Sequence, residues 1–317
     1  MAVHCMQDLP WGRLRRLAHG GAMFLLPLGP LEDHGAHLPA GVDWFLTEGF
    51  TRDMARLLSE RRPDLEVVLV PTLAVGASLM HNLGCIRMGS GVLKRALVDM
   101  GIALEREGVR RLVLISTHGA MSQAYALNGV CRILTRRGRM QAIAPCMRLI
   151  NRFLQGEFRG DLESRLGRAF TQEEWNSLRF DVHAGAWETA LMLKYRPELV
   201  ASFYSELPPH VPERLGLGVL RKLRTHRGYF GAPGLATPEL GEALAAVLAE
   251  QGARALLEFA DAPLPHRAPL ASNPGKTAVV ATGLGLAMAV TWVWLASGGH
   301  QRNPPVETRS GAVQPRA

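Results

Sequence analysis

The stretch AMFLLPLGPLEDHGAHLPAGVD, residues 22–43, joins an apolar run to a cluster of acidic and imidazole side chains. Its first part, residues 22–29, is hydrophobic on both faces, which is typical of a strand buried in a parallel sheet. Carboxylates and histidines follow directly behind it. Because ligand sites of parallel sheets collect beyond the carboxyl ends of the strands, we expect a functional site in this loop.

The same arrangement recurs along the chain. Apolar runs bounded by turn residues predict further strands at 66–73, 111–117 and 140–146. Helical spacing of apolar residues predicts helices at about 44–61, 90–107 and 121–137, and an Ala/Leu-rich helix at about 238–260. Strands that alternate with helices predict an α/β fold, in which helices cover both faces of a mostly parallel sheet.

Composition narrows the classes of function. The 317 residues carry a net charge of +8, but the basic residues are scattered and aromatic residues make up only 6%, so a nucleic-acid binder is disfavoured and no nucleic-acid partner is expected. The four cysteines form no CxxC pair, which suits a reducing compartment. The N-terminus shows no basic region followed by an apolar one, so no signal peptide is expected.

The C-terminal part has a different character. A Pro-rich stretch, residues 261–276, reads as a linker behind a domain of residues 1–260. Residues 277–297 then contain no charge, and 21 residues suffice to cross a hydrocarbon core of about 30 Å. We predict a single-pass transmembrane helix there, with a polar disordered tail at 298–317 and the domain of residues 1–260 in the cytoplasm. A buried core helix is the alternative.

Glu32, His34 and Asp43 are the first candidate site residues. Glu32 and His34 are two positions apart as they leave the strand, so they could face one cavity, and carboxylate with imidazole suits Zn, Mn or Fe. The alternative is a polar loop whose Asp43 caps the next helix. His118 favours the metal reading, because it follows another predicted strand at the same edge of the sheet.

The segment DVHAGAWETALML, residues 181–193, adds two more candidates. His183 precedes a helix and Glu188 lies in its first turn, where stabilisation of the helix dipole is the alternative role. In the functional reading Glu188 is a fifth metal ligand and His183 a nearby general acid or base. Three carboxylates would then offset two divalent cations.

These residues resemble the motifs of the creatininase (creatinine amidohydrolase) family. Residues 27–43 match its Pro-x-Gly-x-x-Glu-x-His-Gly-x-His-Leu-Pro signature with a following Asp. Residues 181–193 are similar to its His-Ala-Gly-x-x-Glu-Thr-Ser segment, and GYFGAPGLATPELGEAL (228–244) to a later Gly-x-x-Gly-Asp-Pro segment. The similarity runs in the same order from about residue 20 to 260.

The resemblance implies a three-layer α/β/α sandwich, a two-metal site and hydrolysis of unusual C–N amide bonds by a metal-activated hydroxide. Family activities include opening a cyclic amide, deformylating a pyrimidine precursor and trimming a cofactor-precursor peptide. Carried over by residue, one metal takes Glu32, Asp43 and His118, and the other takes His34, Glu188 and a bridging Asp43.

The resemblance also assigns supporting residues and an assembly. His183 would handle protons near the scissile nitrogen. His37 is assigned a supporting role around the metal ligands, and Ser78 and His81 still match the substrate side. Family members are commonly oligomeric, so a homo-oligomer acting on a small-molecule amide is expected.

The chain departs from the family pattern in four places, of which Glu-Thr-Ala for Glu-Thr-Ser (188–190) and Gly-Ala-Pro for Gly-Asp-Pro (231–233) are the smaller ones. The strand end at His118 reads STHGAMSQ (116–123) instead of Asn-Gly-His-Gly-Gly-Asn, so Ala120 and Met121 should narrow or reshape that wall of the pocket. The usual Phe-Pro-Gly-Thr is replaced by LGCIRMG (83–89). These departures leave one alternative of another class open, a catalytically silent, membrane-tethered binding or scaffold protein.

Overall fold

The computed structural model describes residues 3–78, 85–211 and 228–263. The chain divides into two units, Met1–Leu270 and Ala271–Ala317, and every described residue falls in the first. Among these described segments, no helix has both the length and the apolar character needed to cross a membrane. The predicted transmembrane segment, residues 277–297, lies outside them, as does His81.

Five parallel strands form the sheet in the order β1-β3-β2-β4-β5. Their bounds are Val3–Cys5 (β1), Met23–Pro27 (β2), Val67–Leu69 (β3), Arg111–Ile115 (β4) and Gln141–Ile143 (β5). The predicted α/β fold with a parallel sheet is confirmed, although each strand is shorter than its apolar run. The sequence did not predict β1, because this three-residue edge strand is only half-buried and carries no apolar pattern.

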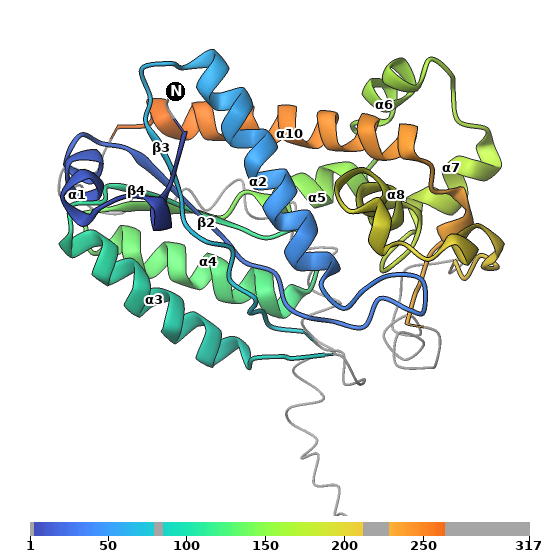
Figure 1. Ribbon diagram of the computed structural model, residues 1–317, viewed down its shortest axis with the longest axis horizontal. Coiled ribbons are helices and arrows are strands. Elements are labelled where there is room, and N and C mark those ends of the chain that lie inside the picture. The colour runs from blue at the N-terminus through green and yellow to red at the C-terminus, as the bar shows by residue number, and fades with distance from the viewer. Residues whose placement is uncertain (1–2, 79–84, 212–227, 264–317) are drawn as a thin grey trace, which may run out of the picture. The chain divides into compact units, whose positions relative to one another are not determined.

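The sheet is covered by helices on both faces (Figure 1). The α-helices are α1 (Trp11–His19), α2 (Val42–Arg61), α3 (Ser90–Arg106), α4 (Met121–Arg136), α5 (Cys146–Leu154), α6 (Arg159–Leu166), α7 (Gln172–Arg179), α8 (Ala186–Tyr195) and α10 (Pro238–Asp261). Short 3-10 turns are η1 (Met6–Asp8), η2 (Pro197–Leu199), η3 (Ser202–Glu206) and η4 (Pro233–Leu235).

Alternate residues of β2 divide the core between the two faces. Phe24 and Leu26 pack with residues of α3 and α4, while Met23 and Leu25 pack with residues of α2, α5 and α10. Both sets are fully buried, which explains why β2 reads as a continuous apolar run rather than an alternating one.

A third core lies beyond the sheet, around α8. It joins α8 to α10, to the start of α2, and to the short helices α6 and α7. Gly241 of α10 lies directly against α8, since a Cβ there would come 2.0 Å from the carbonyl oxygen of Ala190. This close contact holds α8, whose first turn faces the end of β2.

Candidate metal centre

The loop behind β2 and the start of α2 lie close together at the carboxyl edge of the sheet. Glu32 and His34 belong to this loop, and Asp43 lies in the first turn of α2. Gly29 makes the approach possible, because a Cβ there would come 2.4 Å from the backbone oxygen of Asp43. A side chain at position 29 would therefore separate the loop from the helix that carries Asp43.

His118 reaches the same place from the neighbouring strand. It lies three residues beyond the end of β4, which pairs with β2 along its whole length. Its Nδ1 is 3.2 Å from Oε2 of Glu32 and 3.1 Å from Oδ2 of Asp43. All three side chains are buried, and together they form the first candidate cation cluster.

A second cluster forms where α8 meets the loop. Nε2 of His34 lies 3.6 Å from Oε2 of Glu188 and 3.8 Å from Oδ2 of Asp43. The His183 ring packs against that of His34 at a tilt of 41°, with centroids 4.4 Å apart. One potential ligand atom from each of His34, His183 and Glu188 lies within 4.8 Å of the others.

The structure thus brings together all five residues that the sequence assigned to metal binding. It also places His183, which was assigned a proton-transfer role alone, within this second group. Asp43 lies between the two clusters, in contact range of His118 on one side and His34 on the other. This is the place that a bridging carboxylate would take.

Hydrogen bonds orient the candidate ligand atoms. Nδ1–H of His34 donates to the backbone oxygen of Glu32 at 2.9 Å, which leaves Nε2 as the ring atom with a lone pair. Ser78 donates its hydroxyl to Oε1 of Glu32, which leaves Oε2 facing His118. Oε2 of Glu188 accepts from the backbone N–H of Ala184 at 2.5 Å.

Charge interactions shift the pKa values of the buried groups strongly. Burial alone would lower the pKa of His118, but the carboxylates of Asp43 and Glu32 raise it to about 9. Burial would likewise lower the pKa of His34, but the carboxylates of Glu188 and Asp43 outweigh it, and the pKa is raised. Burial would raise the pKa of Asp43, but His118 and His34 lower it to about 2. The carboxylates of Glu32, Asp43 and Glu188 therefore favour a positive charge between them.

Divalent metal ions fit these residues. Oε2 of Glu32, Nε2 of His34 and Oδ2 of Asp43 are buried and make no hydrogen bond within the described part of the chain. Buried polar atoms without partners cost free energy, and buried carboxylates cost more unless a cation offsets them. Imidazole nitrogen with carboxylate oxygen is a ligand set suited to Zn or Mn.

His37 supports the loop that carries His183. Its Nε2–H donates to the backbone oxygen of Ala184 at 3.1 Å and lies 3.2 Å from the hydroxyl of Thr189. Ala184 has a φ of 48°, in the left-handed region that residues with a Cβ rarely adopt. Burial lowers the pKa of His37 to about 4, so the ring stays neutral and keeps this arrangement at neutral pH.

Asp181 is a supporting residue that the sequence interpretation missed. Its buried carboxylate accepts hydrogen bonds from the backbone N–H groups of Ala186 and, at 3.4 Å, Ala232. Burial raises its pKa to about 8. Gly185 and Gly231 lie so close to it that a Cβ on either would clash. An Asp just before a helix start is the signal that could have identified it.

A family model described as "Creatininase: Creatinine amidohydrolase" matches residues 7–256. The chain belongs to the creatininase family. This confirms the resemblance that the sequence motifs carry. Members of the family named among its relatives act on carbon–nitrogen bonds, and the candidate metal centre described above lies within the matched residues.

Two curated relatives show the range of the family. The mycofactocin precursor peptide peptidase of Mycobacterium ulcerans (strain Agy99) is 28% identical over 180 residues, 56% of this chain and 59% of the relative. The creatinine amidohydrolase of Pseudomonas putida is 27% identical over 204 residues, 61% of this chain and 72% of the relative. The chain thus covers less than two thirds of the length of the first relative.

Solved creatininases share the fold. The structure described as "Creatininase Mn" has a TM-score of 0.62 at 22% identity, covering 81% of this chain and 99% of the other. A creatininase mutant described as "Zn-Zn type" has a TM-score of 0.59 at 22% identity, covering 81% of this chain and 98% of the other. The three-layer arrangement expected from the motifs agrees with this likeness.

Proposed function

We propose that this protein is a metal-dependent amidohydrolase that cleaves a non-standard C–N amide bond. The observation that carries the proposal is the set of buried ligand atoms on Glu32, His34 and Asp43, which make no hydrogen bond among the described residues and converge where β2, β4 and α8 meet. A site with no cation to bind would normally give such buried atoms hydrogen bonds or expose them to water. Membership of the creatininase family supports the same conclusion.

Two groups of residues would hold two divalent ions, for which Mn and Zn are the best candidates. Glu32, Asp43 and His118 would hold one ion, and His34 and Glu188 the other, with Asp43 shared. When bound, the pair would lower the pKa of a water molecule and polarise the amide carbonyl. Ser78 and the backbone of Glu32 keep the ligand atoms pointing into the site.

His183 is the proposed proton-transfer residue. Its Nε2–H donates to the backbone oxygen of Asp33 at 2.7 Å, which fixes the tautomer and leaves the lone pair on Nδ1. That nitrogen can accept a proton and pass it to the leaving amine nitrogen. The ring is only half-buried and packs against the ring of His34, so it is both accessible and fixed in place.

The substrate class is a cyclic amide, a formamide or a small peptide-like amide. The relatives named for a precursor peptide and for creatinine both lie within this class. The half-buried Glu188 and His183 define the side from which such a molecule would reach the ligand atoms, since the first cluster is fully buried.

A silent binding protein is the second candidate function. Two departures from the family motifs favour it: Ala120 and Met121 replace the Gly-Asn pair behind His118, and LGCIRMG (83–89) replaces the substrate-side Phe-Pro-Gly-Thr. Two bound metals together with no turnover on any amide would support this candidate over the first.

Metal stoichiometry tests the proposal. We expect elemental analysis of the purified full-length chain to find about two divalent ions per chain. Glu32→Ala and Asp43→Ala should lose bound metal and turnover on a panel of lactams, formamides and peptides. Asp99→Ala is the matched control, since this exposed carboxylate pairs only with Arg95 among the described residues. Full metal content in the first two variants would disprove the assignment.

The membrane anchor at residues 277–297, the cytoplasmic location and a homo-oligomeric state stay predictions from the sequence. An anchored amidohydrolase would act at a membrane surface, and the uncharged length of this segment is what supports it.

A further inference from the structure

A pocket of about 240 Å³ adjoins the candidate metal centre. Residues of α2, α5, α8 and α10 line it, together with Thr117 and Gly119 at the end of β4. These two residues flank His118, and Glu188 belongs to both the pocket wall and the second cation cluster. The pocket is therefore continuous with the centre rather than a separate cavity in the core.

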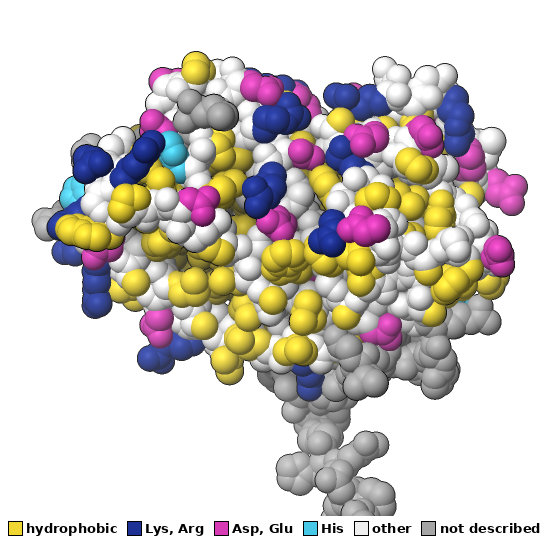
Figure 2. Space-filling view, in the orientation of Figure 1, with side chains coloured by type: hydrophobic (Ala, Val, Ile, Leu, Met, Phe, Trp, Pro, Cys, Tyr) yellow, Lys and Arg dark blue, Asp and Glu magenta, His cyan; other side chains and the backbone are white. Residues whose placement is uncertain are grey.

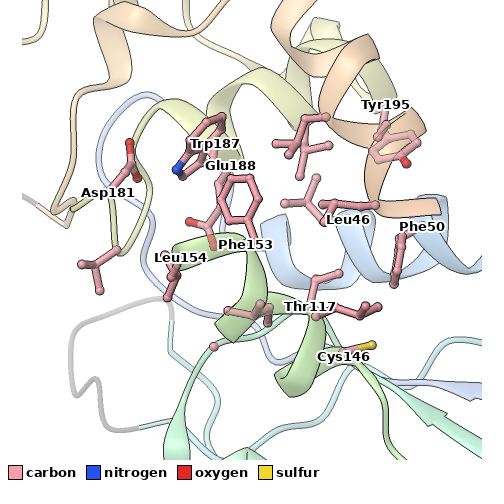
Figure 3. A pocket seen from close by; sticks show the side chains of 18 of the residues that line it. Leu46, Phe50, Thr117, Cys146, Phe153, Leu154, Asp181, Trp187, Glu188 and Tyr195 are labelled. Carbon is pink, nitrogen blue, oxygen red and sulfur yellow. The ribbon is translucent and has the colours of Figure 1, made fainter. Parts of the chain in front are cut away.

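The wall of this pocket is mainly hydrophobic. Ile150, Phe153 and Leu154 form the side contributed by α5, and Trp187 and Leu191 form the side contributed by α8. In Figure 3, Asp181 and Glu188 lie toward one end of the pocket, and the apolar side chains of α2 lie toward the other. A group that extends from the metal centre would thus enter an apolar space.

The charged side chains that line the pocket provide few interactions for a charged ligand. Asp181 already accepts backbone N–H groups, and Glu188 faces His34 at the metal centre. Arg179 is exposed, with its guanidinium over the ring of Phe180. An ion placed among the apolar residues would lose its hydration without gaining a partner, whereas an apolar group would gain free energy by leaving water.

Gly119, rather than Ala120 or Met121, contributes to this lining. Met121 is 44% exposed at the start of α4. The expectation that Ala120 and Met121 reshape a pocket wall therefore does not apply to the pocket beside Glu188, and it stays a prediction for the wall at His118. One side of the pocket is formed by α5, a helix that the sequence did not predict.

We propose that this pocket, called here the α5 pocket, binds an uncharged apolar group of the amide substrate, about as large as a Leu or Phe side chain. The amide itself then lies at the metal centre, so the inference rests on the proposed function and narrows its substrate class to amides with an apolar substituent. A volume of about 240 Å³ is below the roughly 300–1,000 Å³ of pockets that enclose a whole small ligand, so it suits one substituent.

Hydroxamates test the α5 pocket, because the hydroxamate group chelates a divalent ion and carries a variable tail. The full-length chain, loaded with Zn or Mn, is titrated calorimetrically with acetohydroxamate, phenylacetohydroxamate and succinohydroxamate. Burying a phenyl group should tighten binding about 10- to 100-fold over acetohydroxamate. The charged succinyl tail should give no gain.

Two variants in the pocket and two control variants outside it test where the phenyl tail binds. Leu154→Asp places a charge in the pocket and Ile150→Trp fills it, so both should abolish the gain from the phenyl tail. The controls are Asn151→Asp and Arg148→Trp, which make the same additions on α5 outside the lining. An unchanged Kd for acetohydroxamate in each variant shows that the fold and metal centre are intact.

The outcomes separate the two proposals. If acetohydroxamate binds but the phenyl tail adds nothing, or if the controls lose the gain as fully as the pocket variants, the α5 pocket is not the binding site. If the metal-loaded wild type binds no hydroxamate, the proposed function is wrong and the pocket inference falls with it.

Discussion

His37 links protonation to stability through its contacts with the loop of Ala184. Burial lowers the pKa of this imidazole to about 4, against about 6.5 for an unfolded chain. Protonation would place a charge at a ring that is 1% exposed and lies edge-on to the ring of Tyr229. We therefore expect the folded state to resist this protonation while the unfolded chain accepts it.

The direction of the pH effect follows from the lowered pKa. Stability from neutral His37 is fully present above pH 6.5 and is lost as the pH falls toward 4, because only the unfolded chain binds the proton in that window. The difference in pKa amounts to a loss of about 2 kcal/mol at pH 5 and about 3 kcal/mol at pH 4.

The variant His37→Gln, which cannot titrate, isolates this contribution. Urea unfolding of wild type and variant is compared at pH 7.5 and pH 5 with a chelator present, so that metal loss does not enter. The wild type should lose about 2 kcal/mol more than the variant over this interval. His19→Gln, on the exposed end of α1, serves as control and should follow the wild type.

Equal pH dependence of the wild type and His37→Gln would refute the reasoning. It would mean that the ring finds a partner for its second proton, or that water reaches Nδ1 in the folded protein.

Two further predictions concern the loop and the C-terminus. Gly29→Ala should lower both the melting temperature and the metal content, because the new Cβ must displace the backbone of Asp43. Thermal scans and elemental analysis check this. Gly12→Ala is the control, since a Cβ at that position has no atom within 4 Å. Deleting residues 277–317 should move the protein from the membrane fraction to the supernatant after ultracentrifugation. A full-length chain that is already in the supernatant would contradict the anchor.

The residues changed in these tests are distinct from the charged pairs on the surface. Figure 2 shows charged side chains among apolar groups on one face of the molecule. Some surface charges are paired, as in Arg52 with Glu48 and Arg61 with Glu250. Changes at Gly29 or His37 act in the interior, so their effects should not be confused with changes in these surface pairs.

The sequence by itself determined the four strands β2 to β5 and the residues proposed to hold the metals. An apolar run such as 22–29 must be buried on both faces, and a parallel strand ends where its polar loop begins, so the loop with Glu32 and His34 had to lie at the carboxyl edge. His118, behind another predicted strand, and Glu188, in the first turn of a predicted helix, were found in the same way, and the family resemblance implied how the five residues divide between two metals. These are local features, written in consecutive residues.

Only the tertiary structure decided how these residues meet. Residues far apart in the chain form three features of the site. These are the ring contact between His183 and His34, the hydrogen bonds of Asp181 at the start of α8, and the α5 pocket. Helices of eight or nine residues, such as α5 to α7, are marginal on their own, and packing against α8 and α10 stabilises them. The candidate ligands could be identified from the sequence, whereas the shape of the pocket beside them depends on how the helices pack.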